Sequence, residues 1–134
     1  MHMPPPVHGA AMVGKYIHDS KVINEAFCCH YFNLTLARSL GDIGKGGIRK
    51  LVDFVSQLVC IKRAVRLVRP ALCYVTPNAK GFAFYKDFFV VQMLKGLGCN
   101  IVIHYHNKGV ATRQNRVFDN FLYKRFFRGL KVIL

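Results

Sequence analysis

A repeated alternation between apolar runs and helical patterns constrains the fold of this chain more than any other feature of its sequence. Short runs rich in β-branched and aromatic residues are separated by longer segments in which apolar residues recur every three or four positions. The predicted strands are residues 28–35, 71–77, 100–106 and 131–134, and the predicted helices are 9–18, 47–69, 80–97 and 111–128. Strands joined through helices form parallel sheets with right-handed crossovers. We therefore predict an α/β fold with a Rossmann-like, doubly wound, mainly parallel sheet and helices on both faces.

The C-terminal ends of the predicted helices are marked by proline or glycine, the residues that typically end helices. The longest helix, 47–69, is stopped by Pro70, and Gly98 and Gly129 stand where the next two helices end. The apolar side of helix 47–69 is predicted from its periodicity as Ile48, Leu51, Val52, Val55, Leu58, Val59, Val65 and Val68.

The two ends of the chain interrupt this pattern. The first predicted helix should follow a strand, yet only residues 1–3 precede the prolines at 4–6, and the last strand has hardly begun at residue 134. The 134 residues suffice for one domain. We therefore expect residues 1–134 to form a single Rossmann-like domain truncated at both ends, without its first strand and without everything that follows residue 134.

The net charge is the strongest compositional signal. Lysine and arginine number 20 against 6 for aspartate and glutamate, which gives a formal charge of +14. Such a charge attracts nucleic acid, anionic lipid head groups or phosphorylated substrates. No apolar run reaches the ~18 residues that a membrane span needs, and the start lacks a signal-peptide pattern. The five cysteines lie in apolar stretches without a C-x-x-C pair, so we expect buried, reduced thiols in a cytoplasmic protein.

The segment after the three prolines combines a histidine with small residues. His8, Gly9 and Ala10 stand where a loop would open into the first predicted helix. Backbone N–H groups at such a helix start attract anions, and small side chains let a phosphate or a sugar approach them. These three residues are therefore candidates for substrate binding. The alternative is that the small residues let the helix pack tightly on the sheet.

Two histidines end the strand predicted over 100–106. His104 and His106 are two positions apart, so their side chains would share one face near the carboxyl end, where parallel sheets bind ligands. An imidazole there can move a proton near neutral pH, and we assign His106 as the candidate catalytic residue. The candidate binding residues beside it are His104, Asn107 and Lys108, and a packed core histidine is the alternative for His104. A zinc site would need a third ligand. His8 could come near, but no cysteine or acidic residue supports the H-x-H pair, so we expect no metal.

A third stretch, residues 113–131, interleaves basic residues with Phe118, Phe121, Phe126 and Phe127. A helix of this kind can lie on a lipid surface or bind nucleic acid. Alternatively, the aromatic residues of this helix face the core and its basic residues face solvent.

At "PPPVHGAAMVGKYI" (4–17) and "IVIHYHNKG" (101–109) the chain resembles the N-terminal domain of bacterial GT-B glycosyltransferases. The most similar are the family 4, or group 1, enzymes of capsule, lipopolysaccharide and exopolysaccharide synthesis. Those domains open with a strand, a Pro-rich turn and a small-residue loop, and they carry a strand of D-V-V-H type and a later strand that ends in histidine. "RPALCYVTPN" (69–78) is similar to the first of these strands but lacks its usual aspartate, and "NIVIHYHN" (100–107) is similar to the second.

The resemblance implies the N-terminal, acceptor-side half of a GT-B fold without a metal or other cofactor. The enzyme would transfer a sugar from a nucleotide-sugar donor to a glycan or a polyprenyl-phosphate-linked acceptor. By motif match, Gly9 and Ala10 would face the donor phosphates, and His106 would contact the transferred sugar. The C-terminal GT-B domain of the full-length chain would hold the donor, and the fragment alone would be inactive. The anionic inner face of the cytoplasmic membrane would attract the basic surface.

Two other functions remain open from the sequence. One is a basic nucleic-acid-binding α/β module, for which the charge is the only argument, so we do not favour a nucleic-acid partner. The other is a nucleotide-binding domain of a different enzyme class. The sequence contains no carboxylate pair of the hydrolase type, no G-x-G-x-x-G or Walker loop, no G-x-S-x-G elbow and no zinc-finger signature.

Overall fold

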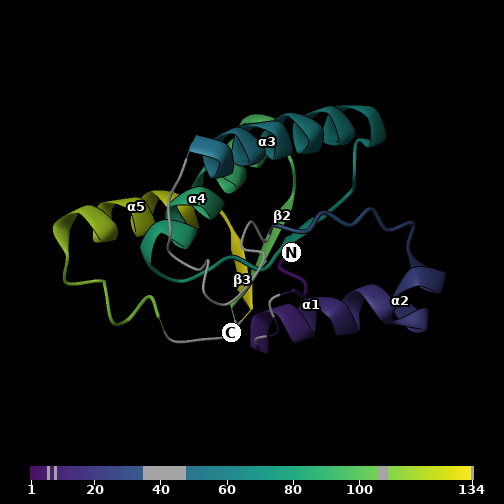
Figure 1. Cartoon of the computed structure of the whole chain (residues 1–134), viewed down its shortest axis with the longest axis horizontal. Coiled ribbons are helices and arrows are strands. Elements are labelled where there is room, and N and C mark those ends of the chain that lie inside the picture. Colours follow the sequence, from purple (N-terminus) through teal and green to yellow (C-terminus); the bar gives the residue numbers. More distant parts are fainter. Residues whose placement is uncertain (6, 8, 35–47, 106–108, 134) are drawn as a thin grey trace.

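The computed structural model of the chain describes residues 1–5, 7, 9–34, 48–105 and 109–133 (Figure 1). Its helices are α1 (Gly9–Asp19), α2 (Lys21–Ala26), α3 (Ile48–Val68), α4 (Gly81–Gly96) and α5 (Val117–Phe127). Its strands are β1 (Cys73–Val75), β2 (Ile101–His104) and β3 (Lys131–Ile133). The predicted α/β class is confirmed.

The sheet contains three parallel strands in the order β1-β2-β3. Cys73 lies opposite Ile101 where β1 pairs with β2, and Val102 lies opposite Lys131 where β2 pairs with β3. α4 connects β1 to β2, and α5 connects β2 to β3. These connections confirm the predicted parallel arrangement. The strands are three or four residues long and thus shorter than predicted.

Residues 1–3 lie beside residues 32–34. The Met1 ammonium group donates to the Phe32 carbonyl oxygen at 2.9 Å, and the Leu34 N–H donates to the Met1 carbonyl oxygen at 2.8 Å. One residue bonded to two partners that are two positions apart is the hydrogen-bond pattern of parallel neighbours. The Asn33 side chain completes the pairing, because its amide accepts from the Met3 N–H and donates to the Met3 carbonyl oxygen.

The prediction of a strand over 28–35 is wrong for the described residues 28–34, which form no regular strand. Residues 1–3 offer a hydrogen-bonding partner only to residues 32–34. The residues before Phe27 form a second short helix. This helix, α2, begins after Ser20, whose hydroxyl accepts a hydrogen bond from the Ile23 N–H at 3.4 Å, and it ends at Ala26.

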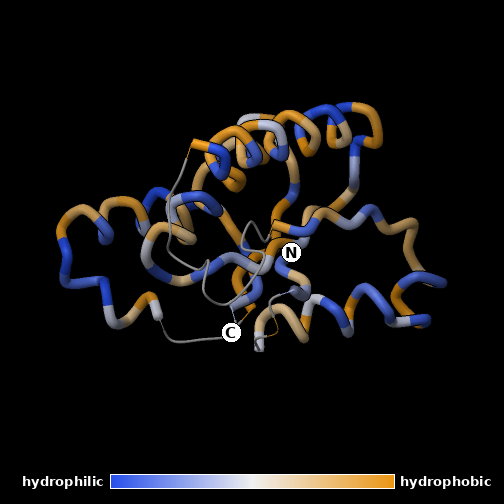
Figure 2. Tube along the Cα trace, viewed as in Figure 1, coloured by the Kyte–Doolittle hydropathy of each residue, from blue (hydrophilic) through white to orange (hydrophobic). Residues whose placement is uncertain are grey.

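The main core lies between the sheet and a layer formed by α3, α4 and α5. α4 packs between the two other helices and is apolar on nearly all sides, as expected of a helix enclosed on several sides (Figure 2). Its Phe84 packs against Tyr123 and Phe126 of α5, with ring centroids 4.7 and 5.3 Å apart. The strands contribute Val75, Ile101 and Ile103 to the same cluster. α1 and α2 lie on the other side of the strands from α3 (Figure 1).

Only some of the residues that were predicted to form the buried side of α3 are in fact packed on the core. Leu58 and Val65 pack on the core with Phe54 and Ile61, as the periodicity suggests. The prediction is wrong for the exposed residues Ile48, Leu51, Val52, Val55, Val59 and Val68. The helix carries two apolar stripes, and periodicity alone cannot tell which of them faces the core.

The predicted C-terminal glycines are confirmed. Gly98 and Gly129 follow α4 and α5 and have φ angles of +72° and +73°, a conformation that side chains with a Cβ rarely adopt. The helix predicted over 111–128 begins only at Val117. Residues 109–116 form turns, in which the N–H groups of Arg113 and Gln114 both donate to the Val110 carbonyl oxygen.

All five cysteines are free thiols, as predicted, but the prediction that they are buried is wrong. Cys60 is exposed on α3, and Cys28 is exposed on the irregular segment after α2. Cys29, Cys73 and Cys99 are half-buried.

Candidate functional site

Residues 1–3 connect the segment 32–34 to the end of β1 through hydrogen bonds. These residues lie beside 32–34 and also beside the end of β1, where the His2 N–H donates to Thr76 Oγ1 at 3.2 Å. The chain therefore leaves residues 1–3 toward 32–34 on one side and leaves β1 toward β2 on the other. Parallel α/β sheets bind their ligands beyond the carboxyl ends of the strands. This carboxyl edge of the sheet is the candidate site.

The start of α1 borders this edge. α1 begins at Gly9, which is exposed and has open space where a Cβ would stand, and Ala10 is half-buried. The close contact of α1 lies one turn further on, where a Cβ on Gly14 would stand 2.0 Å from the His2 carbonyl oxygen. The close approach of α1 therefore depends on Gly14 and not on Gly9. His8 lies outside the described residues.

His104 ends β2 and contacts the neighbouring strand. Tyr74 Oη and His104 Nδ1 form a hydrogen bond, and the two rings meet edge to face with centroids 5.8 Å apart. Burial raises the pKa of the Tyr74 phenol, so its hydroxyl remains a donor at neutral pH. His104 is thus a half-buried histidine that a residue of β1 holds in place.

Tyr105 follows β2 and extends the ladder, because its N–H donates to the Ile133 carbonyl oxygen at 3.0 Å. Its side chain is buried and packs on Phe127, with ring centroids 5.8 Å apart. Burial and the nearby charge of Asp87 raise the pKa of the Tyr105 phenol. The candidate catalytic residue His106 and the candidate binding residues Asn107 and Lys108 come next in the chain and lie outside the described residues.

A buried polar cluster that sequence reasoning missed lies under the loop after β1. Asp87 of α4 is fully buried, and its Oδ2 accepts from the backbone N–H and the side-chain Nδ2 of Asn78, each at 2.8 Å. His2 Nε2 lies 3.1 Å from the same oxygen, and Lys86 Nζ lies 3.1 Å from Oδ1. Lys86 also donates to the Leu34 carbonyl oxygen. The cluster thus ties residues 2, 34 and 78 to α4.

The charges in this cluster set its protonation. Burial alone would raise the pKa of Asp87, but the hydrogen bond with His2 and the charge of Lys86 outweigh burial and lower the pKa from 3.8 to about 2. The carboxyl group is therefore ionised at neutral pH. Burial lowers the pKa of the nearby Met1 ammonium group from 8.0 to about 6.

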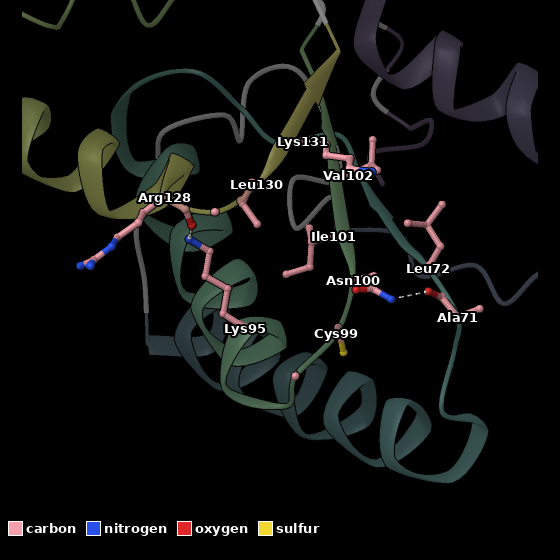
Figure 3. Close-up of a pocket in the computed structure, with 12 residues that line it drawn as sticks. Ala71, Leu72, Lys95, Cys99, Asn100, Ile101, Val102, Arg128, Leu130 and Lys131 are labelled. Carbon is pink, nitrogen blue, oxygen red and sulfur yellow. Dashed lines mark hydrogen bonds between the residues drawn. The ribbon is translucent and has the colours of Figure 1, made fainter.

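A hollow of about 710 Å³ lies at the opposite edge of the sheet (Figure 3). Its walls are residues 71–72, 98–102 and 128–131 with Lys95, most of which directly precede the three strands. In Figure 3 the Lys95 ammonium group points at the end of α5. It donates to the carbonyl oxygens of Arg125, Phe126 and Arg128 at 3.0, 2.7 and 2.8 Å. The Lys95 ammonium group of the hollow thus serves to cap the end of α5. We therefore place the candidate site at the carboxyl edge and not at this hollow.

Neither a metal cluster nor a membrane span is found in the described part of the chain. No three histidine, cysteine, aspartate or glutamate side chains among its residues gather as metal ligands would. No helix within the same ranges is long and apolar enough to cross a bilayer.

Comparison with models of protein families, with curated proteins and with solved structures gives no match to this chain. Its function must therefore be argued from its own residues.

Proposed function

We propose that this chain is the acceptor-side N-terminal half of a GT-B glycosyltransferase of the family 4, or group 1, type. The full-length enzyme would transfer a sugar from a nucleotide-sugar donor to a glycan acceptor on a polyprenyl phosphate, in the synthesis of bacterial surface polysaccharide. The observation that supports the proposal is the position of residues 1–3 between residues 32–34 and the end of β1. A doubly wound sheet would have its reversal of strand order at this place, and Gly9 and His104 of the family-like segments stand at the start of α1 and at the carboxyl end of β2.

The proposed roles of the residues follow from the chemistry. In the transfer, the bond between the anomeric carbon and the diphosphate oxygen breaks, and a bond to the acceptor oxygen forms. The leaving diphosphate gains negative charge, which the backbone N–H groups at Gly9 and Ala10 would stabilise. His106 would stand beside the transferred sugar and take part in positioning or proton transfer. His8, His104, Asn107 and Lys108 would line the donor and acceptor pocket, and no metal or other cofactor is proposed.

The test of this proposal uses the full-length gene product and membranes that carry the acceptor. We expect His106→Ala to lower the transfer rate by about 10²-fold or more, the scale of a positioned acid–base group. Wild-type activity in this variant would remove His106 from the site. A full-length chain without a second Rossmann-like domain after residue 134 would overturn the GT-B assignment.

The donor side of the proposal can be tested on the chain itself. The family pattern places the nucleotide-sugar site mainly in the C-terminal domain. We therefore expect weak or no binding of uridine- or guanosine-diphosphate sugars to residues 1–134 in calorimetry. Tight, saturable binding would instead favour a nucleotide-binding domain of another enzyme class.

A basic nucleic-acid-binding module is the second candidate, and the charge of +14 is the observation that favours it. Salt weakens binding to nucleic acid and to anionic lipid alike, so the two must be compared at one ionic strength. We expect binding to anionic vesicles and none to duplex DNA or RNA. The opposite result would favour the second candidate.

A further inference from the structure

Cys73 and Cys99 form a pair of neighbouring thiols where β1 and β2 begin. Cys73 starts β1 and lies opposite Ile101 of β2, and Cys99 stands two positions before Ile101. Side chains two positions apart along a strand share one face of the sheet, so this arrangement brings the two cysteines to the same face. Their thiol groups are joined by a hydrogen bond.

Backbone hydrogen bonds fix both members of the pair. The Cys73 N–H donates to the Asn100 carbonyl oxygen at 2.8 Å, and the Cys99 N–H donates to the Leu94 carbonyl oxygen at 3.1 Å. The Asn100 side chain donates to the Ala71 carbonyl oxygen at 3.2 Å (Figure 3). Both cysteines also pack on the hydrophobic core. The two sulfur atoms are thus held beside each other by the fold itself.

The pair can be reached from the hollow at the edge where the strands begin. Cys99 is one of the residues that line this hollow of about 710 Å³, and both Cys73 and Cys99 are half-buried. The charged residues that line the hollow are Lys95, Arg128 and Lys131, and none of the described residues along its wall is acidic. Solvent therefore has a path to the thiols, and the charge near them is positive.

We propose that Cys73 and Cys99 bind a soft monovalent metal ion, Cu(I), between their sulfur atoms. Thiolate sulfur is a ligand that selects Cu(I) over harder ions. Each thiol loses its proton on binding, so two protons are released for each ion bound. Two thiolates and one Cu(I) ion carry a single negative charge, which the basic residues of the hollow stabilise. The site is independent of the proposed sugar transfer, which is assigned to the opposite edge of the sheet.

The number of ligands distinguishes Cu(I) from zinc. Structural Zn²⁺ sites take four ligands, whereas no third histidine, cysteine, aspartate or glutamate side chain in the described ranges joins this pair. Cu(I) forms stable complexes with two thiolates that face each other across the ion. With metal–sulfur bonds of about 2.3 Å, the two sulfur atoms would stand about 4.6 Å apart, close to the spacing of two hydrogen-bonded thiols.

The register of the strands argues against a disulfide between the same residues. Cys73 lies directly opposite Ile101, so Cys99 lies diagonal to it. Diagonal neighbours in a sheet are about 7–8 Å apart, whereas the two Cα atoms of a disulfide are about 4.4–6.8 Å apart. A metal ion between the sulfur atoms spans the longer distance without movement of the backbone.

The experiment uses the whole chain with Cys28, Cys29 and Cys60 replaced by serine, so that Cys73 and Cys99 are its only thiols. Cu(I), kept reduced by ascorbate under nitrogen, is titrated in competition with the coloured chelator bathocuproine disulfonate. We expect one Cu(I) ion per chain, a thiolate-to-metal absorption band in the ultraviolet, and two sulfur neighbours of copper in X-ray absorption. The temperature of unfolding should rise, because the ion binds the folded state.

Variants of this two-thiol chain test the ligands. Cys73→Ala or Cys99→Ala should lower the affinity for Cu(I) at least about a hundredfold, since loss of a mere outer partner of a metal ligand already costs about 10–100-fold. The matched control, Cys29→Ser/Cys73→Ala/Cys99→Ala, keeps the exposed thiols of Cys28 and Cys60, which lie after α2 and on α3. It should bind Cu(I) as weakly as the single variants do. Circular dichroism checks that each variant is folded.

Three results would overturn the proposal. They are the absence of a one-to-one complex in the two-thiol chain, equal affinity in the matched control, and ready formation of a Cys73–Cys99 disulfide with oxidised glutathione. The last result, seen as a loss of two hydrogen atoms in the mass, would assign the pair to thiol–disulfide exchange. If one alanine variant fails to fold, the other variant and the X-ray absorption of the two-thiol chain decide. No sugar nucleotide is present, so failure here leaves the test of sugar transfer untouched.

Discussion

His2 Nε2 and Asp87 Oδ2 lie 3.1 Å apart in the interior, although 85 residues separate them in the sequence. The pair joins the start of the chain to the second turn of α4, and Asn78 binds the same carboxylate oxygen from the loop after β1. Two segments that border the candidate site are therefore fixed by one buried carboxylate. This relationship makes Asp87 a positioning residue for the carboxyl edge.

Stability should fall in acid because of Asp87. The pKa of this carboxyl group is about 2 in the folded chain and near 3.8 when exposed, so the folded state favours the ionised form. Its contribution is complete above about pH 4 and is lost as the pH falls from about 4 to 2. The shift corresponds to about 2 kcal/mol in the free energy of unfolding, to be measured by urea unfolding at stepped pH.

Comparison of two variants isolates this contribution. Asp87→Asn leaves Lys86 buried without its charge partner, so we expect a loss of about 3 kcal/mol or more at pH 7 and a smaller dependence on pH below 4. Asp53→Asn, on an exposed position of α3, should keep the acid dependence of the wild type. An unchanged pH profile in a folded Asp87→Asn protein would contradict the assignment.

Lys95 should stabilise the end of α5. Its ammonium group donates to three carbonyl oxygens there that helix geometry leaves without partners. We expect Lys95→Met to lower the free energy of unfolding by about 1–3 kcal/mol and to speed hydrogen exchange in the last turn of α5. Lys124→Met, an exposed position on the same helix, should change stability by less than about 0.5 kcal/mol. Equal effects of the two substitutions would assign the loss to charge rather than to the helix end.

Sequence patterns predict those parts of the fold that depend on residues close together in the chain. The ends of α3 and α4 lie within one or two residues of the predicted ends, because Pro70 and Gly98 act on the backbone at their own positions. The parallel order of the three strands also follows from strands that alternate with helices. The strand predicted for residues 28–34 is absent because a strand needs a partner of similar length. The partner here is the segment of residues 1–3 at the start of the chain, which is too short.

The candidate site is less predictable than the fold. The position of His104 at the carboxyl end of β2 follows from the sequence, but its bond with Tyr74 depends on the register between two strands. The Asp87 cluster carried one signal, since Lys86 and Asp87 stand together within the otherwise apolar first half of α4. Their partners come from distant segments, so only the tertiary structure reveals that the pair is buried.

The cysteines should differ strongly in reactivity. Burial, together with the neighbouring Cys99, raises the pKa of the Cys73 thiol to about 12, whereas Cys28 and Cys60 are exposed. Because the thiolate is the nucleophile, we expect Cys73 to react with iodoacetamide at pH 8 at least about a hundredfold more slowly than Cys28 and Cys60. Timed labelling followed by peptide mass spectrometry measures each rate. Equal labelling of Cys73 and Cys60 in the folded chain would contradict its burial.

Gly14 offers the sharpest test of how α1 meets the start of the chain. Replacement of glycine by alanine inside a helix ordinarily stabilises it by about 1 kcal/mol, because alanine loses less backbone entropy on folding. At Gly14 the added Cβ would stand 2.0 Å from the His2 carbonyl oxygen, a backbone atom that cannot move without breaking the contacts around Asp87. We therefore expect Gly14→Ala to destabilise the chain by about 1–3 kcal/mol.

Gly96 in the last turn of α4 is the matched control. A Cβ there meets no atom within 4 Å, so Gly96→Ala should leave stability unchanged or raise it. Urea unfolding of both variants measures the difference, and opposite signs are the expected result. If Gly14→Ala were as stable as Gly96→Ala, α1 would not pack on residues 2 and 3 at this distance. The start of α1 would then not be held at the carboxyl edge, and Gly9 and Ala10 would lose their place in the candidate site.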